Sequence, residues 1–238
     1  GPATGQRCTA PRMLCMQEGT EAVTKALKDI CDTGLVPGKE IGNPFKEGVK
    51  MGPLVDRGAH QRMKETIALA KELGAEVHGE LHVSDNIVPQ ARNESSYWVN
   101  PIVIDWSNVD LANADNAKRI HDCMKDEIFG PLVHIVHPVK TLDEAIEVTN
   151  KLNTQGLAGA IFTADQAELD QYRNNTSITS LAVNGVPKDL SPEGPHGHPG
   201  LDTIGGKTHF THYANEHVEK KFGNGITLNT GGAAAVGR

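Results

Sequence analysis

The sequence has few aromatic side chains and no long apolar run. Aromatic residues make up 4% of the 238 residues and hydrophobic residues 38%, so we expect an aliphatic core in one large domain or two small ones. No run approaches the roughly 20 apolar residues that a membrane-spanning helix needs. No charged segment followed by an apolar one suggests secretion. The sequence therefore predicts no membrane partner.

The chain also lacks a net positive charge and closely spaced cysteine pairs. Its formal net charge is −7, which argues against a nucleic-acid partner, because phosphate binding needs clustered Lys and Arg. The four cysteines, Cys8, Cys15, Cys31 and Cys123, include no C-x-x-C pair. We therefore expect free thiols in a reducing compartment, and a cytoplasmic location. Cys15 and Cys31 are expected to pack inside, and Cys123 to be an exposed thiol.

Apolar periodicity and capping residues predict the helices and strands. One helix is expected over 21–33, with Val23, Ala26, Leu27 and Ile30 on one face. A second begins after Asp56 and ends at Gly74. A short helix is expected near 115–123, and two more after the capping boxes Thr141-x-x-Glu144 and Asp165-x-x-Glu168. The expected strands are 12–16, 75–79, 97–104, 132–139, 159–163, 180–185 and, at an edge, 225–229.

The second half of the chain alternates strands with helices. Strands 132–139, 159–163 and 180–185 are separated by predicted helices, a spacing that implies right-handed crossovers and a parallel sheet. The predicted fold class is therefore α/β, with three layers: a parallel sheet and helices on both of its faces. No internal repeat is present.

One cysteine stands in a setting that suits chemistry. Cys8 lies in Gly-Gln-Arg-Cys-Thr, where Arg7 is its neighbour and Gly5 allows close approach of the backbone to a ligand. A nearby cation lowers a thiol pKa and so increases the fraction of reactive thiolate. The alternative is a small buried side chain that only packs, because free cysteines are often buried. The residues alone leave both interpretations open.

Two further patterns are interpreted as surface segments. His196 and His198, followed by three more histidines up to His217, have no carboxylate or cysteine at a supporting interval, and we expect a polar loop without metal. Gly205-Gly206-Lys207-Thr208 resembles the end of a phosphate-binding loop. That loop is rejected because Leu201 occupies the position of its first glycine.

Three motifs occur in the order typical of one enzyme family. GQRCTAPR at 5–12 resembles the active-site stretch G-Q-x-C-x-A-x-x-R of the aldehyde dehydrogenase superfamily. VKMGPLVD at 49–56 resembles its D-x-x-M-G-P-L-I segment, and KDEIFGPLVHIVHP at 125–138 its E-E-I-F-G-P-V motif. Beyond AVNG the match weakens, and PEGPHGHPGLDTIGGKTH is loosely similar to the endings of semialdehyde dehydrogenases. The resemblance thus extends the expected substrates to semialdehydes.

The resemblance implies a role for each matching residue. Cys8 corresponds to the nucleophile that adds to the aldehyde, and its backbone N–H to one of two donors to the oxyanion. Glu127 corresponds to the carboxylate that binds the nicotinamide ribose, and Phe129 to the aromatic ring bordering the nicotinamide. Arg7 and Thr9 would line the substrate pocket, with residues 187–199 as its other wall.

The resemblance also implies cofactors, domains and partners. The cofactor is NAD or NADP, both open because the cofactor domain chooses between them. That domain precedes the nucleophile in the family, and the opening Gly-Pro suggests a tag remnant or a cut chain. We therefore expect residues 1–222 to form the catalytic domain of a longer parent, and 223–238 a flexible or oligomerisation tail. The expected partners are a small-molecule aldehyde and further copies in a homo-oligomer, and the isolated chain is expected to be inactive.

Two alternatives differ in chemistry or in class. An acylating relative would release its thioester to coenzyme A, although the Gly-Gln-Arg-Cys-Thr stretch favours hydrolysis. A non-catalytic interaction or assembly protein would use the same fold without turnover. The altered segment after Asn184 motivates this second alternative.

Overall fold

The computed structural model describes residues 2–7, 10–79, 81, 97–124, 127–152, 158–176, 178, 180–185 and 227–230. The chain divides into two compact units. The first comprises Gly1–Arg7 and Arg12–Thr141, and the second Cys8–Pro11 and Leu142–Arg238. Among the described helices, none has both the length and the apolar character needed to cross a membrane.

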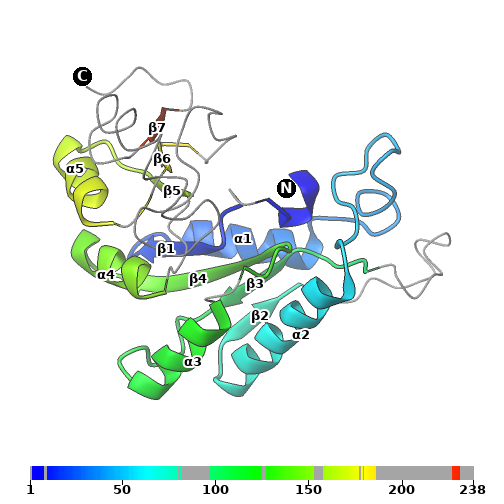
Figure 1. Ribbon diagram of the computed structural model, residues 1–238, viewed down its shortest axis with the longest axis horizontal. Coiled ribbons are helices and arrows are strands. Elements are labelled where there is room, and N and C mark those ends of the chain that lie inside the picture. The colour runs from blue at the N-terminus through cyan, green and yellow to red at the C-terminus, as the bar shows by residue number, and fades with distance from the viewer. Residues whose placement is uncertain are drawn as a thin grey trace, which may run out of the picture. The chain divides into compact units, whose positions relative to one another are not determined.

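The first unit is built on a four-stranded sheet in the order β1-β4-β3-β2 (Figure 1). Strands β1 (Met13–Gln17), β4 (Leu132–Val139) and β3 (Ile102–Asp105) run parallel, while β2 (Glu76–His78) pairs antiparallel with β3. Every residue of β3 is buried, the pattern of a strand covered on both faces. Helix α1 (Glu21–Thr33) lies on one side of this sheet, and α2 (Arg57–Glu72) and α3 (Ala114–Met124) on the other. A short 3₁₀ helix (Pro2–Gly5) precedes β1.

Helix α2 confirms its predicted boundaries. The Asp56 side chain accepts a hydrogen bond from the Ala59 N–H at 2.8 Å, which satisfies a backbone donor that the first turn leaves free. Met63 and Ile67 are among the residues of its buried stripe. The chain leaves the helix at Gly74, whose φ of +85° favours glycine.

Helix α1 forms as predicted, but its apolar face does not supply the contact to the sheet. Val23 is 52% exposed and Ile30 53% exposed. The Lys28 ammonium instead lies 2.7 Å from the buried Asp105 carboxylate of β3, which requires a cationic partner because it is withdrawn from water. Asp32 adds a hydrogen bond of 2.8 Å from the Gly79 N–H. Charge pairing, rather than the apolar stripe, attaches α1 to strands β2 and β3.

The second unit has its own sheet and core. Strands β5 (Ala158–Ile161), β6 (Ser180–Val183) and β7 (Thr227–Thr230) run parallel in the order β5-β6-β7, with helices α4 (Leu142–Leu152) and α5 (Gln166–Asn175). Strand β7 confirms the edge strand predicted near 225–229. The buried core consists of Ile146, Ile161, Leu169, Tyr172, Ile178, Leu181 and Val183.

The α/β class is confirmed, but the distribution of the strands is not as predicted. The sequence places 132–139, 159–163 and 180–185 in one parallel sheet. In the described part of the chain, β4 belongs to the first sheet, whereas β5 and β6 form the second with β7. Periodicity determines that a segment is a strand, but partner choice depends on contacts distant in sequence. The difference is therefore one of pairing and not of element type.

The capping box at Asp165 also forms in part as predicted and in part with a different partner. Asp165 caps α5 as predicted, because its side chain accepts from the Ala167 N–H at 2.7 Å. The Asp165 N–H donates to the Thr163 hydroxyl at 3.0 Å, and Glu168 also hydrogen-bonds that hydroxyl. The Thr163 hydroxyl thus accepts the hydrogen bond from the N-cap N–H, which is the role that the capping box assigns to the Glu168 side chain.

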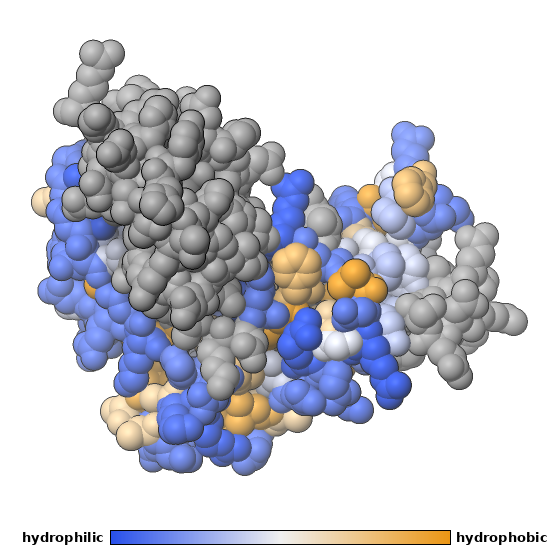
Figure 2. Space-filling view, viewed as in Figure 1, coloured by the Kyte–Doolittle hydropathy of each residue, from blue (hydrophilic) through white to orange (hydrophobic). Residues whose placement is uncertain are grey.

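The remaining features are the described cysteines and the exposed apolar residues. Cys15, Cys31 and Cys123 are partly buried. The prediction of an exposed Cys123 is wrong: its thiol donates to the Thr66 hydroxyl at 3.2 Å between α3 and α2. Figure 2 shows separate apolar patches among mostly hydrophilic residues on the face that it displays. Phe45, in the loop before α2, is 96% exposed.

Candidate active site

The segment before Cys8 is held along the loop that contains the second motif. The Thr4 hydroxyl donates to the Gly52 carbonyl at 3.0 Å and accepts from the Gly52 N–H at 3.1 Å. The Gln6 amide donates to the Pro53 carbonyl at 3.0 Å and accepts from the Val55 N–H at 2.6 Å. The first motif and the MGPLVD motif are therefore joined by side-chain to backbone hydrogen bonds.

The third motif reaches the first through two glycines. Gly5 has a φ of +71°, and a Cβ placed on it would lie 2.4 Å from the Gly130 carbonyl oxygen, a separation that real side chains do not adopt. A Cβ on Gly130 would lie 2.7 Å from the Met63 sulfur of α2. Only glycine lets the two backbones come this close. The three motifs of the sequence thus meet in the first unit.

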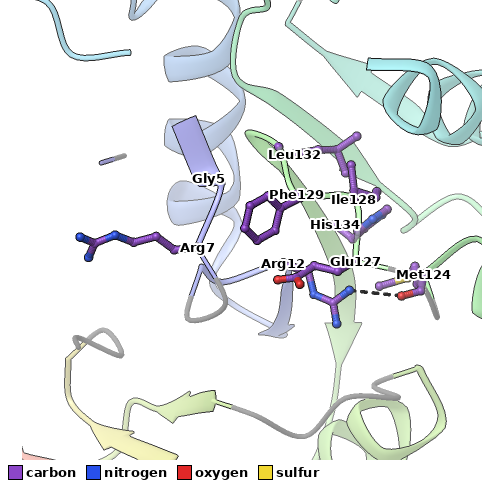
Figure 3. A pocket seen from close by; sticks show the side chains of 10 residues that line it. Gly5, Arg7, Arg12, Met124, Glu127, Ile128, Phe129, Leu132 and His134 are labelled. Carbon is purple, nitrogen blue, oxygen red and sulfur yellow. Dashed lines mark hydrogen bonds between the residues drawn. The ribbon is translucent and has the colours of Figure 1, made fainter. Parts of the chain in front are cut away.

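A pocket opens where these motifs meet. The pocket is small: its cavity volume is about 10 Å³, roughly the room that one water molecule needs. Figure 3 shows the side chains of Glu127 and Arg12 in the same part of the lining and the Phe129 ring above them in the view, while the Arg7 side chain extends away from the other labelled residues. The lining residues are Gly5, Arg7, Arg12, Met124, Glu127, Ile128, Phe129, Gly130, Leu132 and His134.

Glu127 and Arg12 form the charged part of the pocket lining, together with the exposed Arg7. Burial raises the pKa of the Glu127 carboxyl, and the positive charge of Arg12 opposes that rise. Burial lowers the pKa of the Arg12 guanidinium, and the charge of Glu127 opposes that change. Arg12 Nη1 also donates to the Met124 carbonyl at 3.3 Å (Figure 3). The pocket therefore presents a partly buried carboxylate beside a cation.

His134 lines the same pocket as a neutral base. Its Nδ1 accepts a hydrogen bond from Trp106 Nε1 at 3.1 Å, and the two rings stack with centroids 6.0 Å apart. Burial, followed by the charge of Arg12, lowers the pKa of His134 to about 3. The imidazole therefore contributes polarity without positive charge at neutral pH.

Phe129 is held in a backbone conformation that is rare for its type. Its φ is +57°, in the left-handed region that favours glycine. Non-glycine residues keep such strain mainly where the surroundings fix them, which is often at ligand sites. Its position between Glu127 and Gly130 brings both its ring and the neighbouring carboxylate to the pocket.

The structure brings three of the five predicted site residues together. Arg7, Glu127 and Phe129 line the same pocket. Cys8 and Thr9 lie outside the described residues, as do residues 187–199 and the histidines from His196 to His217. Within the described ranges, no group of three or more His, Cys, Asp or Glu side chains is placed to hold a metal ion.

Sequence reasoning did not assign two polar residues of the pocket. Arg12 ends the GQRCTAPR stretch one position before the arginine of the G-Q-x-C-x-A-x-x-R pattern, which would fall on Met13, so the motif gave only an indirect signal for it. His134 lay inside a predicted strand and had no signal of its own. The strand register places it beside Ile104, and only that register brings it to Trp106.

Comparison with known proteins agrees with this geometry. A sequence model described as "Aldehyde dehydrogenase family" matches residues 2–222. The chain belongs to the aldehyde dehydrogenase family. It is 29% identical to a malonate-semialdehyde dehydrogenase of Geobacillus kaustophilus over 79% of its length and 35% of that protein. It is 27% identical to a 1-pyrroline-5-carboxylate dehydrogenase of Geobacillus thermodenitrificans over 76% of its length and 30% of that protein.

Solved aldehyde dehydrogenases share the fold. The structure of betaine aldehyde dehydrogenase from Staphylococcus aureus in complex with NAD+ matches with a TM-score of 0.65 and 23% identity, covering 82% of this chain and 35% of that one. An aldehyde dehydrogenase mutant from Bacillus cereus matches with a TM-score of 0.63 and 24% identity over the same shares. The chain thus spans about a third of the length of these relatives.

The close approach at Gly5 predicts a large cost for an added methyl group. We expect Gly5→Ala to lower the free energy of unfolding by about 2 kcal/mol more than Gly19→Ala, because the methyl group overpacks the contact to Gly130. Gly19 is a matched control: its φ is +89°, but nothing lies within 4 Å of its added Cβ. Urea denaturation measures both. Equal costs would contradict the close contact.

Burial of neutral His134 predicts loss of stability in mild acid. Its pKa of about 3 lies below the ordinary 6.5, so the unfolded chain binds the extra proton between these values. The stabilisation is complete above pH 6.5 and decreases as the pH falls, by about 2 kcal/mol from pH 7 to pH 5. We expect His134→Asn, which keeps an acceptor for Trp106, to reduce this decrease in urea unfolding. An unchanged pH dependence would argue against a buried neutral imidazole.

Proposed function

We propose that the protein contributes the thiol-bearing part of an aldehyde dehydrogenase, with Cys8 as the nucleophile. Residues 1–222 would form the catalytic domain, followed by a flexible or oligomerisation tail over 223–238. The observation that carries the proposal is the shared pocket of Arg7, Glu127 and Phe129, because Arg7 is the covalent neighbour of Cys8. Family membership supports the same chemistry.

In the proposed reaction, the Cys8 thiolate adds to the carbonyl carbon of the aldehyde and forms a thiohemiacetal. The Cys8 backbone N–H donates to the oxygen that gains negative charge. Loss of a hydride from that carbon gives a thioester on Cys8, and water then releases the carboxylic acid and the thiol. The substrate carbon is oxidised by two electrons, which leave with the hydride.

A nicotinamide cofactor, NAD or NADP, accepts the hydride when it is bound. The chemistry of the lining residues, rather than the volume of the pocket, suits the nicotinamide-ribose end of such a group. Glu127 offers a partly buried carboxylate as an acceptor for ribose hydroxyls, and Phe129 offers an aromatic face held by a strained backbone. The pocket also supplies the apolar side chains of Ile128 and Leu132.

Arg7 supports a more specific proposal about the substrate. It follows Gln6, whose side chain is fixed to the 52–55 loop, and it extends outward from the pocket (Figure 3). A guanidinium in that place suits an aldehyde that carries a carboxylate, because charge-assisted hydrogen bonds to carboxylates are strong. The similarity to malonate-semialdehyde dehydrogenases supports a semialdehyde substrate.

We also propose that the protein acts in the cytoplasm as a homo-oligomer. A reducing compartment suits a sequence whose four cysteines include no C-x-x-C pair. The exposed Val23 and Ile30 on α1 suit a surface that is covered by a neighbouring copy.

The nucleophile is tested by thiol labelling. We expect iodoacetamide to alkylate Cys8 at least about tenfold faster than the other three cysteines, because Arg7 favours its thiolate. Burial raises the pKa of Cys31 to about 11, and burial also raises the pKa of Cys123, so both are slow references. Mass spectrometry of time points gives the four rates. Equal labelling of Cys8 and Cys15 would count against the proposal.

The substrate class is tested by protection of Cys8. Succinic semialdehyde and butanal share a four-carbon chain but differ in the carboxylate. We expect succinic semialdehyde to slow alkylation of Cys8 at a lower concentration than butanal does. Arg7→Gln should reduce this preference about tenfold, the effect of losing one hydrogen bond to a charged group, and Arg7→Lys should keep part of it. No preference in the unsubstituted protein would exclude Arg7 as the carboxylate partner.

A further inference from the structure

We propose that Gln6 is a positioning residue for Arg7 and, through Arg7, for the carboxylate of the substrate. Its side-chain amide holds the backbone from which Arg7 extends at the pocket, by hydrogen bonds to Pro53 and Val55 that we call the Gln6 clamp. The consequence for the substrate rests on the proposed function, in which Arg7 is the carboxylate partner. The clamp itself lies within the described residues and is measurable without substrate.

Both polar ends of the Gln6 amide take part in the clamp. Its Nε2 donates to the Pro53 carbonyl at 3.0 Å, and its Oε1 accepts from the Val55 N–H at 2.6 Å. The side chain thus offers one donor and one acceptor to the loop, as a paired residue does in an antiparallel ladder. A carboxylate of the same shape accepts but does not donate when ionised, and an aliphatic side chain does neither. The two partners together therefore favour glutamine at this position.

The loop that receives these hydrogen bonds is itself fixed. Leu54, between the two partners of the clamp, is 2% exposed, and its N–H donates to the Tyr97 carbonyl at 2.8 Å. Asp56, the residue after Val55, is the N-cap of α2. The loop is therefore held by burial on one side and by a helix on the other. Because the loop is fixed, the clamp fixes Gln6 rather than moving with it.

Gln6 is the residue at which the direction of the chain toward Arg7 is set. Two positions earlier, Thr4 is tied to Gly52 by two hydrogen bonds. Gly5 follows with a φ of +71°, and glycine has the widest range of backbone dihedral angles. The tie at Thr4 alone therefore leaves the direction of the following chain open. Gln6 stands directly before Arg7, so the clamp removes that freedom.

A fixed backbone matters for Arg7 because its side chain is long and exposed. Figure 3 shows that it extends away from the other labelled residues. Ordering the rotatable bonds of an arginine costs conformational entropy when it binds a ligand. A fixed base reduces the number of conformations that are lost at that moment. Arg7 on a clamped backbone should therefore bind a carboxylate more tightly than the same guanidinium on a mobile segment.

The clamp is tested by hydrogen exchange of single amides in the full 238-residue chain. We expect Gln6→Leu to make the Val55 N–H exchange about fivefold faster, the effect of losing one hydrogen bond. The Leu54 N–H, bonded to Tyr97, is the internal reference and should change by less than about twofold, because local opening leaves a neighbouring bond protected. Gln61→Leu, on the exposed surface of α2, is the matched control and should change neither rate. Equal acceleration of both amides in Gln6→Leu would overturn the clamp.

The role toward the substrate is tested by the preference of Cys8 protection for succinic semialdehyde over butanal. Gln6→Leu should reduce this preference about fivefold, and Gln6→Glu, which keeps an acceptor for Val55, should reduce it less. A residue that acts through Arg7 has no further effect once Arg7 is replaced. In Arg7→Gln, adding Gln6→Leu should therefore leave the remaining preference unchanged. A general loosening of the fold would instead weaken protection by both aldehydes alike, and that result would refute the positioning role.

These outcomes separate the inference from the proposed function. If Gln6→Leu keeps the preference while the Val55 amide exchanges faster, the positioning role is wrong and the proposed substrate class stands. If the unsubstituted protein has no preference, the proposed substrate class fails, and the role of Gln6 in selecting it fails too. If Gln6→Leu does not fold, Gln6→Glu decides, because a preference equal to that of the unsubstituted protein would overturn the inference.

Discussion

The site depends on one backbone contact, the close approach of Gly5 to the Gly130 carbonyl. No side chain fits between these two backbones, so the segment before Cys8 lies directly against the turn that follows Phe129. Thr4 and Gln6, on either side of Gly5, fix the same segment to the MGPLVD loop. Three segments that are distant in sequence therefore meet around Thr4, Gly5 and Gln6. Displacement of any of these segments would open the pocket on that side.

Electrostatics in the pocket follow from burial around this contact. Glu127 loses hydration and gains the neighbouring charge of Arg12, while His134 loses its charge and keeps a hydrogen bond from Trp106. The lining therefore contains one carboxyl group, the guanidinium groups of Arg7 and Arg12, and one neutral imidazole. Such an arrangement offers acceptors to hydroxyl groups and limits the net buried charge, which is costly to isolate from water.

A buried charge with a partner of opposite charge also holds α1 against the sheet. The apolar stripe of α1 predicts a helix, and the helix forms, yet the contact to β3 is made by Lys28 and the buried Asp105. A periodic pattern identifies the apolar face of a helix, but it does not specify whether that face is buried against the rest of the same unit. Val23 and Ile30 remain exposed because the polar side of α1 already has a partner in Asp105.

The sequence by itself determined the element types, the α/β class and the family, because these depend on local periodicity, capping residues such as Asp56 and the order of three motifs. It also indicated Glu127 and Phe129 through the third motif. Only the tertiary structure decided that β4 and β5 belong to different sheets in the described chain and that Arg12 and His134 join the pocket. Strand partners and charge neighbours depend on contacts between residues distant in sequence, such as Arg12 with Met124 and Met13 with His134, and local sequence patterns do not specify such contacts.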